Sequence, residues 1–296
     1  MLDASFWEKV KADDLRPPAG FELDLLIEEL EHLLRSPDGR LRDRLAFEIL
    51  SDWVLHGRVD HDLADFGDRR CAALFRGLGD YDSDSIFGRS YAAAMLAMAI
   101  ERDIAARIVD AGTIHRWIGA FLMWWELEND LRGAVDARRG VAHAVAHGAD
   151  VIAAAARSRY LPTDQARVLL GSIVVRLRTS AGSAWLLGED DRLAYATMAL
   201  LHRGDLTAGD LAQAVHPLHH LGGAEARTDL EDGAYARLNA LNWLRALYLQ
   251  LHLGVTAMPW YADDGHFHRP IAQRRQMLDV VAEALQYYSY WLADSD

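Results

Sequence analysis

Helical spacing of apolar residues runs through nearly the whole chain and constrains the fold more than any other feature. Apolar side chains recur at three- and four-residue steps, with charged residues between them. Period-two alternation is missing, and no Asn-Gly or Asp-Gly pair separates two β-branched runs, so the sequence predicts essentially no β-sheet. We therefore predict an all-α protein with well over half of its residues in helix.

The periodic segments are bounded by turn residues, which divide the chain into about eleven helices. The predicted helices are 21–34, 41–55, 61–78, 84–107, 111–127, 139–157, 163–179, 190–202, 208–218, 235–253 and 271–292. Short connections between consecutive helices favour antiparallel neighbours. This organisation is typical of an α-solenoid, a stack of antiparallel helix pairs; a globular all-α bundle is the alternative.

No linker clearly separates two domains, and we predict a single helical domain over residues 1–296. The weakest point is residues 221–232. The N-terminus lacks the basic start and apolar run of a secretory signal, and the most apolar stretches are too short to cross a bilayer. Cys71 is the only cysteine, so no intrachain disulfide can form. These features fit a cytoplasmic protein.

The chain is acidic, with a formal net charge of −13 from 31 Lys and Arg against 44 Asp and Glu. Nucleic acids and anionic membranes bind through a positive face. The charge therefore argues against both as partners.

The most distinctive segment is ENDLRGAVDARRGVAHAVAHGAD, residues 128–150. A polar loop opens it, and we predict that a helix begins at residue 139 or 140. His143, His147 and Asp150 would then stand at positions i, i+4 and i+7 on one helical face.

Three interpretations of this segment stay open. The first is a metal site, but the His-x-x-x-His pair lacks the Glu of a metalloprotease motif and no cysteine ligands accompany it, so we predict no tightly held zinc. The second is acid–base or anion-binding chemistry, in which Arg132 clamps an anion and Asp130 or Asp150 orients an imidazole. The third is an internal network of ion pairs that fixes the loop.

Three further positions have similar character. Residues 82–90, DSDSIFGRS, contain a helix start with Asp84 or Ser85 as N-cap, which leaves Arg89 unexplained. Acidic residues at 189–191 complement a helix dipole. Asn239, Asn242, Arg245 and Tyr248 follow one another at three-residue steps along another helix.

These segments resemble a bacterial family catalogued as domain of unknown function 2785. The resemblance rests on DSDSIFGRSY (82–91), NDLRG followed by GVAHAVAHGAD (129–150), EDDRLA (189–194) and LNALNWLRALYLQL (238–251). Position 141 is Val where the family pattern has Trp, and position 88 is Gly where it has Thr. The resemblance implies a HEAT- or armadillo-like fold and supplies no reaction. It also groups one candidate set: Asp84, Arg89, Asp130, Arg132, His143, His147, Asp150, Asp191 and Arg245.

Two functions remain open, and neither a cofactor nor an enzyme activity follows from the residues. The first is a pocket on a concave face that binds a small polar or anionic molecule. Its candidate catalytic residues are His143, His147, Asp150 and Asp130, and its candidate ligand-binding residues are Arg132, Arg89, Asp84, Asp191, Arg245 and Tyr248. The second is a noncatalytic scaffold that binds a protein partner, which exposed Trp124, Trp125 and Trp243 would favour.

Overall fold

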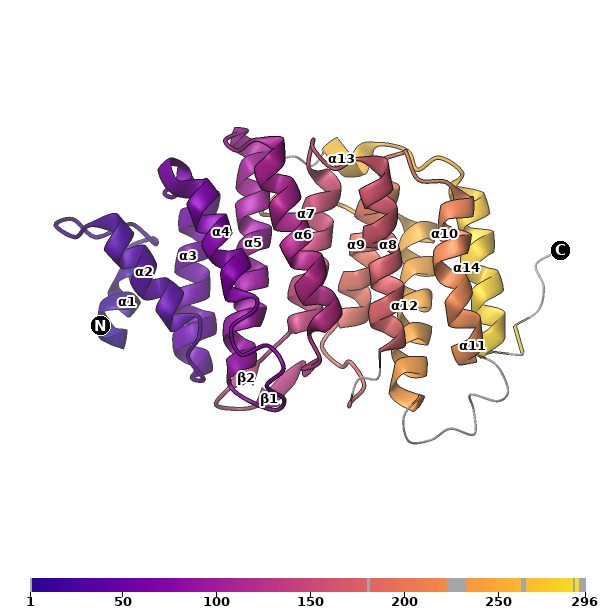
Figure 1. The fold of residues 1–296 in the computed structure, drawn as a ribbon, viewed down its shortest axis with the longest axis horizontal. Coiled ribbons are helices and arrows are strands. Elements are labelled where there is room, and N and C mark those ends of the chain that lie inside the picture. Colours follow the sequence, from indigo (N-terminus) through magenta and orange to yellow (C-terminus); the bar gives the residue numbers. More distant parts are fainter. Residues whose placement is uncertain (1, 180–181, 223–232, 262–264, 290, 293–296) are drawn as a thin grey trace. The chain divides into compact units, whose positions relative to one another are not determined.

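The computed structural model describes residues 2–179, 182–222, 233–261, 265–289 and 291–292 (Figure 1). Helix accounts for 68% of these residues, which confirms the prediction of a mostly helical chain. The contacts divide the chain into two compact units, Met1–Val151 and Ile152–Asp296. The single domain over 1–296 stays a prediction.

The first unit is built from helices that pack on their neighbours. Its elements are α1 (Ala4–Ala12), α2 (Leu23–Leu33), the π-helical η1 (Arg40–Phe47), α3 (Glu48–Leu55), the 3-10 turn η2 (Asp60–Asp62), α4 (Leu63–Ala73), α5 (Ser85–Ala106), α6 (Ala111–Leu127), β1 (Ala134–Asp136), β2 (Gly140–Val141) and the start of α7 (Ala144–Arg157). Helix α5 contacts both α3 and α4, and α4 also contacts α6 (Figure 1). The long apolar run of α5, Ala92–Ile100, is buried, as its composition predicts.

The short hairpin β1–β2 corrects the prediction that a helix begins at residue 139 or 140, while the expectation of essentially no sheet agrees with strands of three and two residues. The two strands pair antiparallel, and Gly140 has φ +70°, a conformation that glycine adopts readily. The Ala142 amide then donates to the Gly133 carbonyl at 2.8 Å. These bonds use the backbone groups that a helix from residue 139 would need, so α7 begins only at Ala144.

The second unit contains the rest of α7 and the elements after it. These are α8 (Thr163–Arg178), α9 (Glu189–Leu201), α10 (Ala208–Val215), the 3-10 turn η3 (His216–Leu218), α11 (His219–Gly222), α12 (Ala234–Leu253), α13 (Gly265–His268) and α14 (Arg274–Tyr288). Helix α12 contacts α8, α9 and α14, and α10 contacts α8 and α14. Trp243 on α12 is fully buried among them.

The predicted helices differ from the observed ones mainly at their ends. Helices α1, α11 and α13 were not predicted, because nine residues or fewer show too little periodicity. Most of the predicted weak point, residues 223–232, lies outside the described residues. Among the described residues, no helix combines the length and apolar character needed to cross a membrane.

Cys71 is half-buried on α4. Burial raises the pKa of its thiol to about 12. The thiol therefore stays protonated near neutral pH, in agreement with an inert role.

His266 on α13 is buried, and its Nε2 donates to the Ala199 carbonyl of α9 at 2.7 Å. Burial lowers the pKa of His266 from 6.5 to about 4. A neutral ring is thus built into the packing of α13 on α9.

Close helix packing in the first unit depends on Gly67 of α4. A Cβ added there would lie 2.1 Å from the Trp117 ring of α6, whereas a Cβ on Gly119 would meet nothing within 4 Å. We expect Gly67→Ala to lower the free energy of unfolding by about 1–3 kcal/mol through overpacking. Gly119→Ala should raise it by about 0.5–1 kcal/mol through helix propensity. Urea unfolding measures the free energy of unfolding of both variants. A change in the same direction in both would contradict the packing assigned to α4 and α6.

The buried neutral His266 makes stability pH-dependent. The unfolded chain binds a proton at this position below about pH 6.5, while the folded chain resists protonation until about pH 4. The contribution of neutral His266 to the free energy of unfolding is therefore complete above pH 6.5. It decreases by on the order of 3 kcal/mol as the pH falls toward 4. Unfolding between pH 7 and 4 should show a weaker pH dependence for His266→Gln than for wild type. The exposed neighbour His268, changed to Gln, is the control that should retain the wild-type slope.

Candidate functional site

Arg89 on α5 lies at the centre of the polar residues in the first unit. Its guanidinium is fully buried and forms two bonds with the Glu128 carboxylate, Nε to Oε2 at 2.5 Å and Nη2 to Oε1 at 3.1 Å. Its Nη1 donates to the Gly77 carbonyl at 2.6 Å and to the Ser85 hydroxyl at 2.8 Å. Every donor nitrogen of the guanidinium is therefore used within the protein, which is what a buried charge requires.

Glu128 follows the last turn of α6, and sequence reasoning missed it. Its carboxylate also accepts bonds from the Trp124 indole at 3.0 Å and from the Asp130 amide at 3.0 Å. The only sequence signal was an acidic residue at a helix end, where the dipole disfavours a negative charge. The Arg89 charge offsets that cost.

Asp130 and Arg132 lie together in the loop after α6, as a bidentate ion pair. Arg132 Nε donates to Asp130 Oδ1 at 2.8 Å and Nη2 to Oδ2 at 2.6 Å. Arg132 also donates to Asp82 at 2.5 Å and to the Ser83 carbonyl at 2.8 Å. The hydrogen bonds that Arg132 donates to Asp130 hold the pKa of Arg132 above its usual value. The pair thus ties the loop after α6 to the loop before α5.

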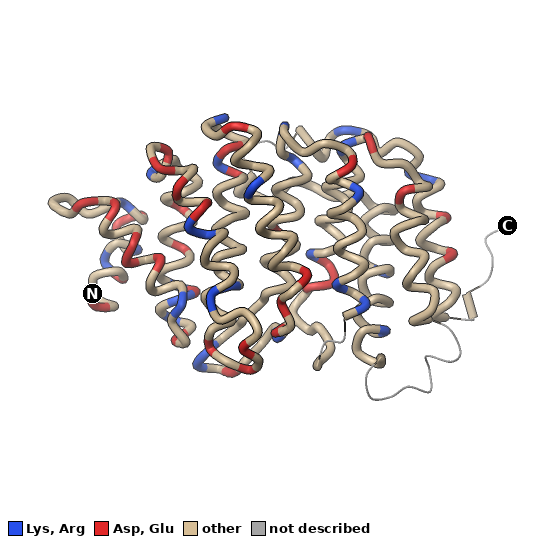
Figure 2. Tube along the Cα trace, in the orientation of Figure 1, with Lys and Arg blue, Asp and Glu red and all other residues tan. Residues whose placement is uncertain are grey.

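Asp84 is the N-cap residue of α5, which confirms one of the two predicted assignments, but its side chain makes no capping hydrogen bond. The first amide of α5, on Ser85, donates instead to the Ser83 hydroxyl at 3.2 Å. The Asp84 carboxylate pairs with Arg139 at 3.2 Å, and Arg139 also donates to Asp136 at 2.7 Å. Charges of both signs gather at this end of the first unit, around β1 and β2 (Figure 2).

His147 on α7 is oriented by Ser90 rather than by Asp130. Ser90 donates its single hydroxyl proton to the Ala142 carbonyl, so its oxygen accepts from His147 Nδ1 at 2.8 Å. The ring packs against Tyr91, with centroids 4.8 Å apart. In this arrangement His147 donates to Ser90 and does not act as its base.

His143 lies outside α7, which corrects its predicted place on one helical face with His147 and Asp150. It has φ +59° and follows the hairpin, and the His147 amide donates to its carbonyl at 2.9 Å. The two imidazole rings still lie 5.9 Å apart, while Asp150 lies two turns into α7. Within the described ranges, no group of three His, Cys, Asp or Glu side chains is placed to hold a metal ion.

Arg42 on η1 is a second fully buried arginine that sequence reasoning missed. It donates to Asp43 at 2.7 Å and to the Val141 carbonyl of β2 at 3.2 Å. The Tyr91 hydroxyl donates to the same Asp43 carboxylate at 2.5 Å, and burial raises the pKa of Tyr91. These bonds hold the hairpin against η1. No local signal in RLRDRLAF distinguishes Arg42 from its exposed neighbours.

The remaining candidates belong to the second unit. Asp191 is exposed in the first turn of α9, and Arg245 is exposed on α12. Tyr248 stacks on His252 with centroids 6.3 Å apart. A pocket shared by these residues and those of the first unit stays a prediction. Three tryptophans whose exposure would favour a scaffold, Trp124, Trp125 and Trp243, are buried.

A cavity of about 240 Å³ lies next to the Arg89 network. It is lined by Arg35, Ala73, Arg76, Gly77, Asp84, Ser85 and Gly88, and we call it the Arg35–Arg76 pocket. A Cβ on Gly88 would lie 3.0 Å from Arg35 Cγ, so the glycine lets the Arg35 stem lie against α5. Arg35 donates to His32 at 3.0 Å, while Arg76 has no ion-pair partner among the described residues.

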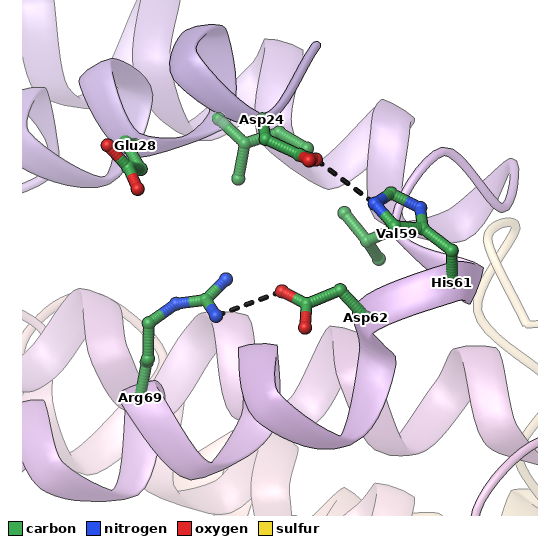
Figure 3. A pocket seen from close by; sticks show the side chains of 7 residues that line it. Asp24, Glu28, Val59, His61, Asp62 and Arg69 are labelled. Atoms are coloured by element: carbon green, nitrogen blue, oxygen red, sulfur yellow. Dashed lines mark hydrogen bonds and ion pairs between the residues drawn. The ribbon is translucent and has the colours of Figure 1, made fainter.

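A second polar cavity, of about 270 Å³, lies between α2 and α4 and is acidic (Figure 3). His61 bonds Asp24 at 3.0 Å, and Arg69 bonds Asp62 at 2.9 Å. Glu28 lies on the α2 side, across the cavity from Arg69 (Figure 3). Three carboxylates against one guanidinium disfavour an anion in this cavity.

The Arg89–Glu128 pair has a measurable stability signature. Glu128→Ala leaves a buried guanidinium without its counter-ion and should lower the free energy of unfolding by about 3–5 kcal/mol. The double variant Arg89→Met, Glu128→Leu removes both charges and should recover most of that loss. Arg40→Ala breaks an exposed pair with Glu8 and should cost less than about 1 kcal/mol. A double variant as unstable as Glu128→Ala would show that the charge pairing is not the cause.

Comparison with known proteins gives a family and no activity. A family model described as "Protein of unknown function (DUF2785)" matches residues 74–249. No curated protein and no solved structure gives a significant match. The matched region runs from the residue after α4 to Leu249 on α12, and therefore includes the whole Arg89 network. Because the match covers more than half of its residues, the chain belongs to the DUF2785 family.

Proposed function

We propose that this protein binds a small polar anion, such as a phosphate or a carboxylate, in the Arg35–Arg76 pocket. The observation that carries the proposal is the Arg76 guanidinium, which borders the cavity without an ion-pair partner among the described residues. Arginine is the side chain best suited to bidentate recognition of phosphate and carboxylate groups.

The charge around the pocket supports an anionic ligand. Arg35 and Arg76 supply two positive charges, while the one carboxylate of the lining, Asp84, is paired with Arg139. The pocket also borders the start of α5, where the helix dipole is positive. The Asp80 carboxylate lies beside Gly77 of the lining and offsets one of these charges, so one positive charge remains, in contrast to the net charge of −13 of the whole chain.

In this proposal the candidate residues of the first unit support the pocket without contacting the ligand. Arg89 bonds the Gly77 carbonyl and the Ser85 hydroxyl, and both of those residues line the cavity. Asp130 and Arg132 hold the Ser83 carbonyl just before α5. We assign them a positioning role, and we assign no reaction to His143, His147 or Asp150.

We further propose that the helices form a HEAT- or armadillo-like α-solenoid. What supports it is the packing within each unit, where a helix contacts neighbours both next to it and two positions along the chain, as α4 contacts α5 and α6. Solenoids commonly present a concave binding surface, and a protein partner on that surface remains the alternative function.

Calorimetric titration with inorganic phosphate tests the anion site. Wild type should bind phosphate, and Arg76→Gln should weaken binding by about tenfold or more, because a hydrogen-bonded charge contributes about 1.5–3 kcal/mol. The matched control is Arg58→Gln, which removes another exposed arginine of the first unit that has no ion-pair partner among the described residues and lies outside the pocket. It should bind phosphate as wild type does.

Two results would reject the anion site. One is the absence of binding by phosphate, sulfate and citrate to the wild-type chain. The other is equal affinity of the wild type and Arg76→Gln. Thermal unfolding of each variant without ligand establishes that the substitutions leave the fold intact, as expected for exposed side chains.

A further inference from the structure

We propose that the second unit carries a separate site for an amphipathic carboxylate, a molecule with an apolar chain and one terminal anionic group. The site is a groove of about 390 Å³ between α8 and α10. Its volume falls within the range of about 300–1,000 Å³ typical of small-molecule sites. The proposal does not depend on the anion site of the first unit.

The groove follows one face of α8. Its lining residues on that helix run from Arg167 to Arg178 at three- and four-residue steps, over about 16 Å of helix. Leu170, Gly171 and Val174 form the apolar middle of this wall. A ligand lying along the groove would therefore contact apolar side chains through most of its length.

Small residues give the groove its depth. A Cβ added to Gly171 would meet nothing within 4 Å, so the space above this glycine is open and is not filled by a neighbouring helix. The opposite wall is lined by Ala214 on α10 and by Pro217 in η3. Gly171 on one wall and Ala214 on the other are small residues, which leaves room for a ligand chain between the helices.

The two ends of the groove differ in charge, and this difference determines which class of ligand fits the groove. At one end Arg167 is paired with Asp210 at 2.7 Å, and this pairing lowers the pKa of Asp210 to about 2. At the other end Arg178 is exposed and has no ion-pair partner among the described residues. An apolar molecule with one terminal carboxylate matches this pattern, with the carboxylate at Arg178 and the chain running toward the neutral pair.

Alkyl carboxylates of increasing length provide the direct test. Calorimetric titration should show binding of decanoate that is tighter than that of octanoate and hexanoate, by about two- to fourfold for each added methylene. Decylammonium has the same chain with the opposite charge and should bind at least tenfold more weakly than decanoate. Equal binding of decanoate and decylammonium, or no binding of decanoate by wild type, would overturn the proposal.

Two variants locate the site. Gly171→Leu fills the middle of the groove and should abolish decanoate binding, and its gain in helix propensity favours a folded protein. Gly119→Leu is the matched control, because Gly119 is also a helical glycine with open space around it but lies on α6. It should bind decanoate as wild type does.

A third variant tests the charged end. Arg178→Gln should weaken decanoate binding about tenfold and leave decylammonium binding unchanged or stronger. Arg76→Gln should not change decanoate affinity, which separates this site from the anion site of the first unit. Wild-type affinity in Gly171→Leu, confirmed as folded by its melting transition, would reject the groove as the site.

Discussion

The buried ion pair between Arg89 and Glu128 is the interaction on which the first unit depends most. Both charges have lost their water, and the loss is offset only if every polar atom around them is in place. Those atoms belong to the loop after α4, the first turn of α5 and the loop after α6. One pair of side chains therefore fixes the path of three chain segments, and the exposed ion pair of Arg132 with Asp82 extends the same connection to the surface.

Most of the charged residues that suggested a functional site contribute to structure. Arg89 and Arg132 donate their hydrogen bonds to carboxylates and carbonyls of the protein, and Arg42 does the same at the hairpin. In contrast, Arg76 beside the first cavity and Arg178 beside the groove of the second unit are among the exposed arginines that have no ion-pair partner in the described part of the chain. The two ligand sites that we propose depend on these two guanidinium groups, whose positive charge opposes the overall charge of the chain.

The sequence predicted the helix boundaries most accurately where the periodic segment is long. Helix α6 was predicted at residues 111–127 and observed at Ala111–Leu127, and α5 differs by one residue at each end. The segment after residue 133 was misjudged because its structure depends on Arg42, which donates to the Arg139 and Val141 carbonyls from about a hundred positions away. Glu128 was missed for the same reason, since its partner Arg89 lies 39 positions earlier in the chain.

The sequence by itself determined the helical class, the positions of the long helices and the acidic charge. These follow from local periodicity and composition, which need no knowledge of distant neighbours. Only the tertiary structure decided which charges are neutralised, that His143 stands outside α7, and where Gly171 leaves space between helices. The physical reason is that burial, pairing and cavity shape are set by contacts between residues far apart in the chain. Those contacts give identical side chains different surroundings, since Arg89 is buried in an ion pair and Arg76 lines a cavity.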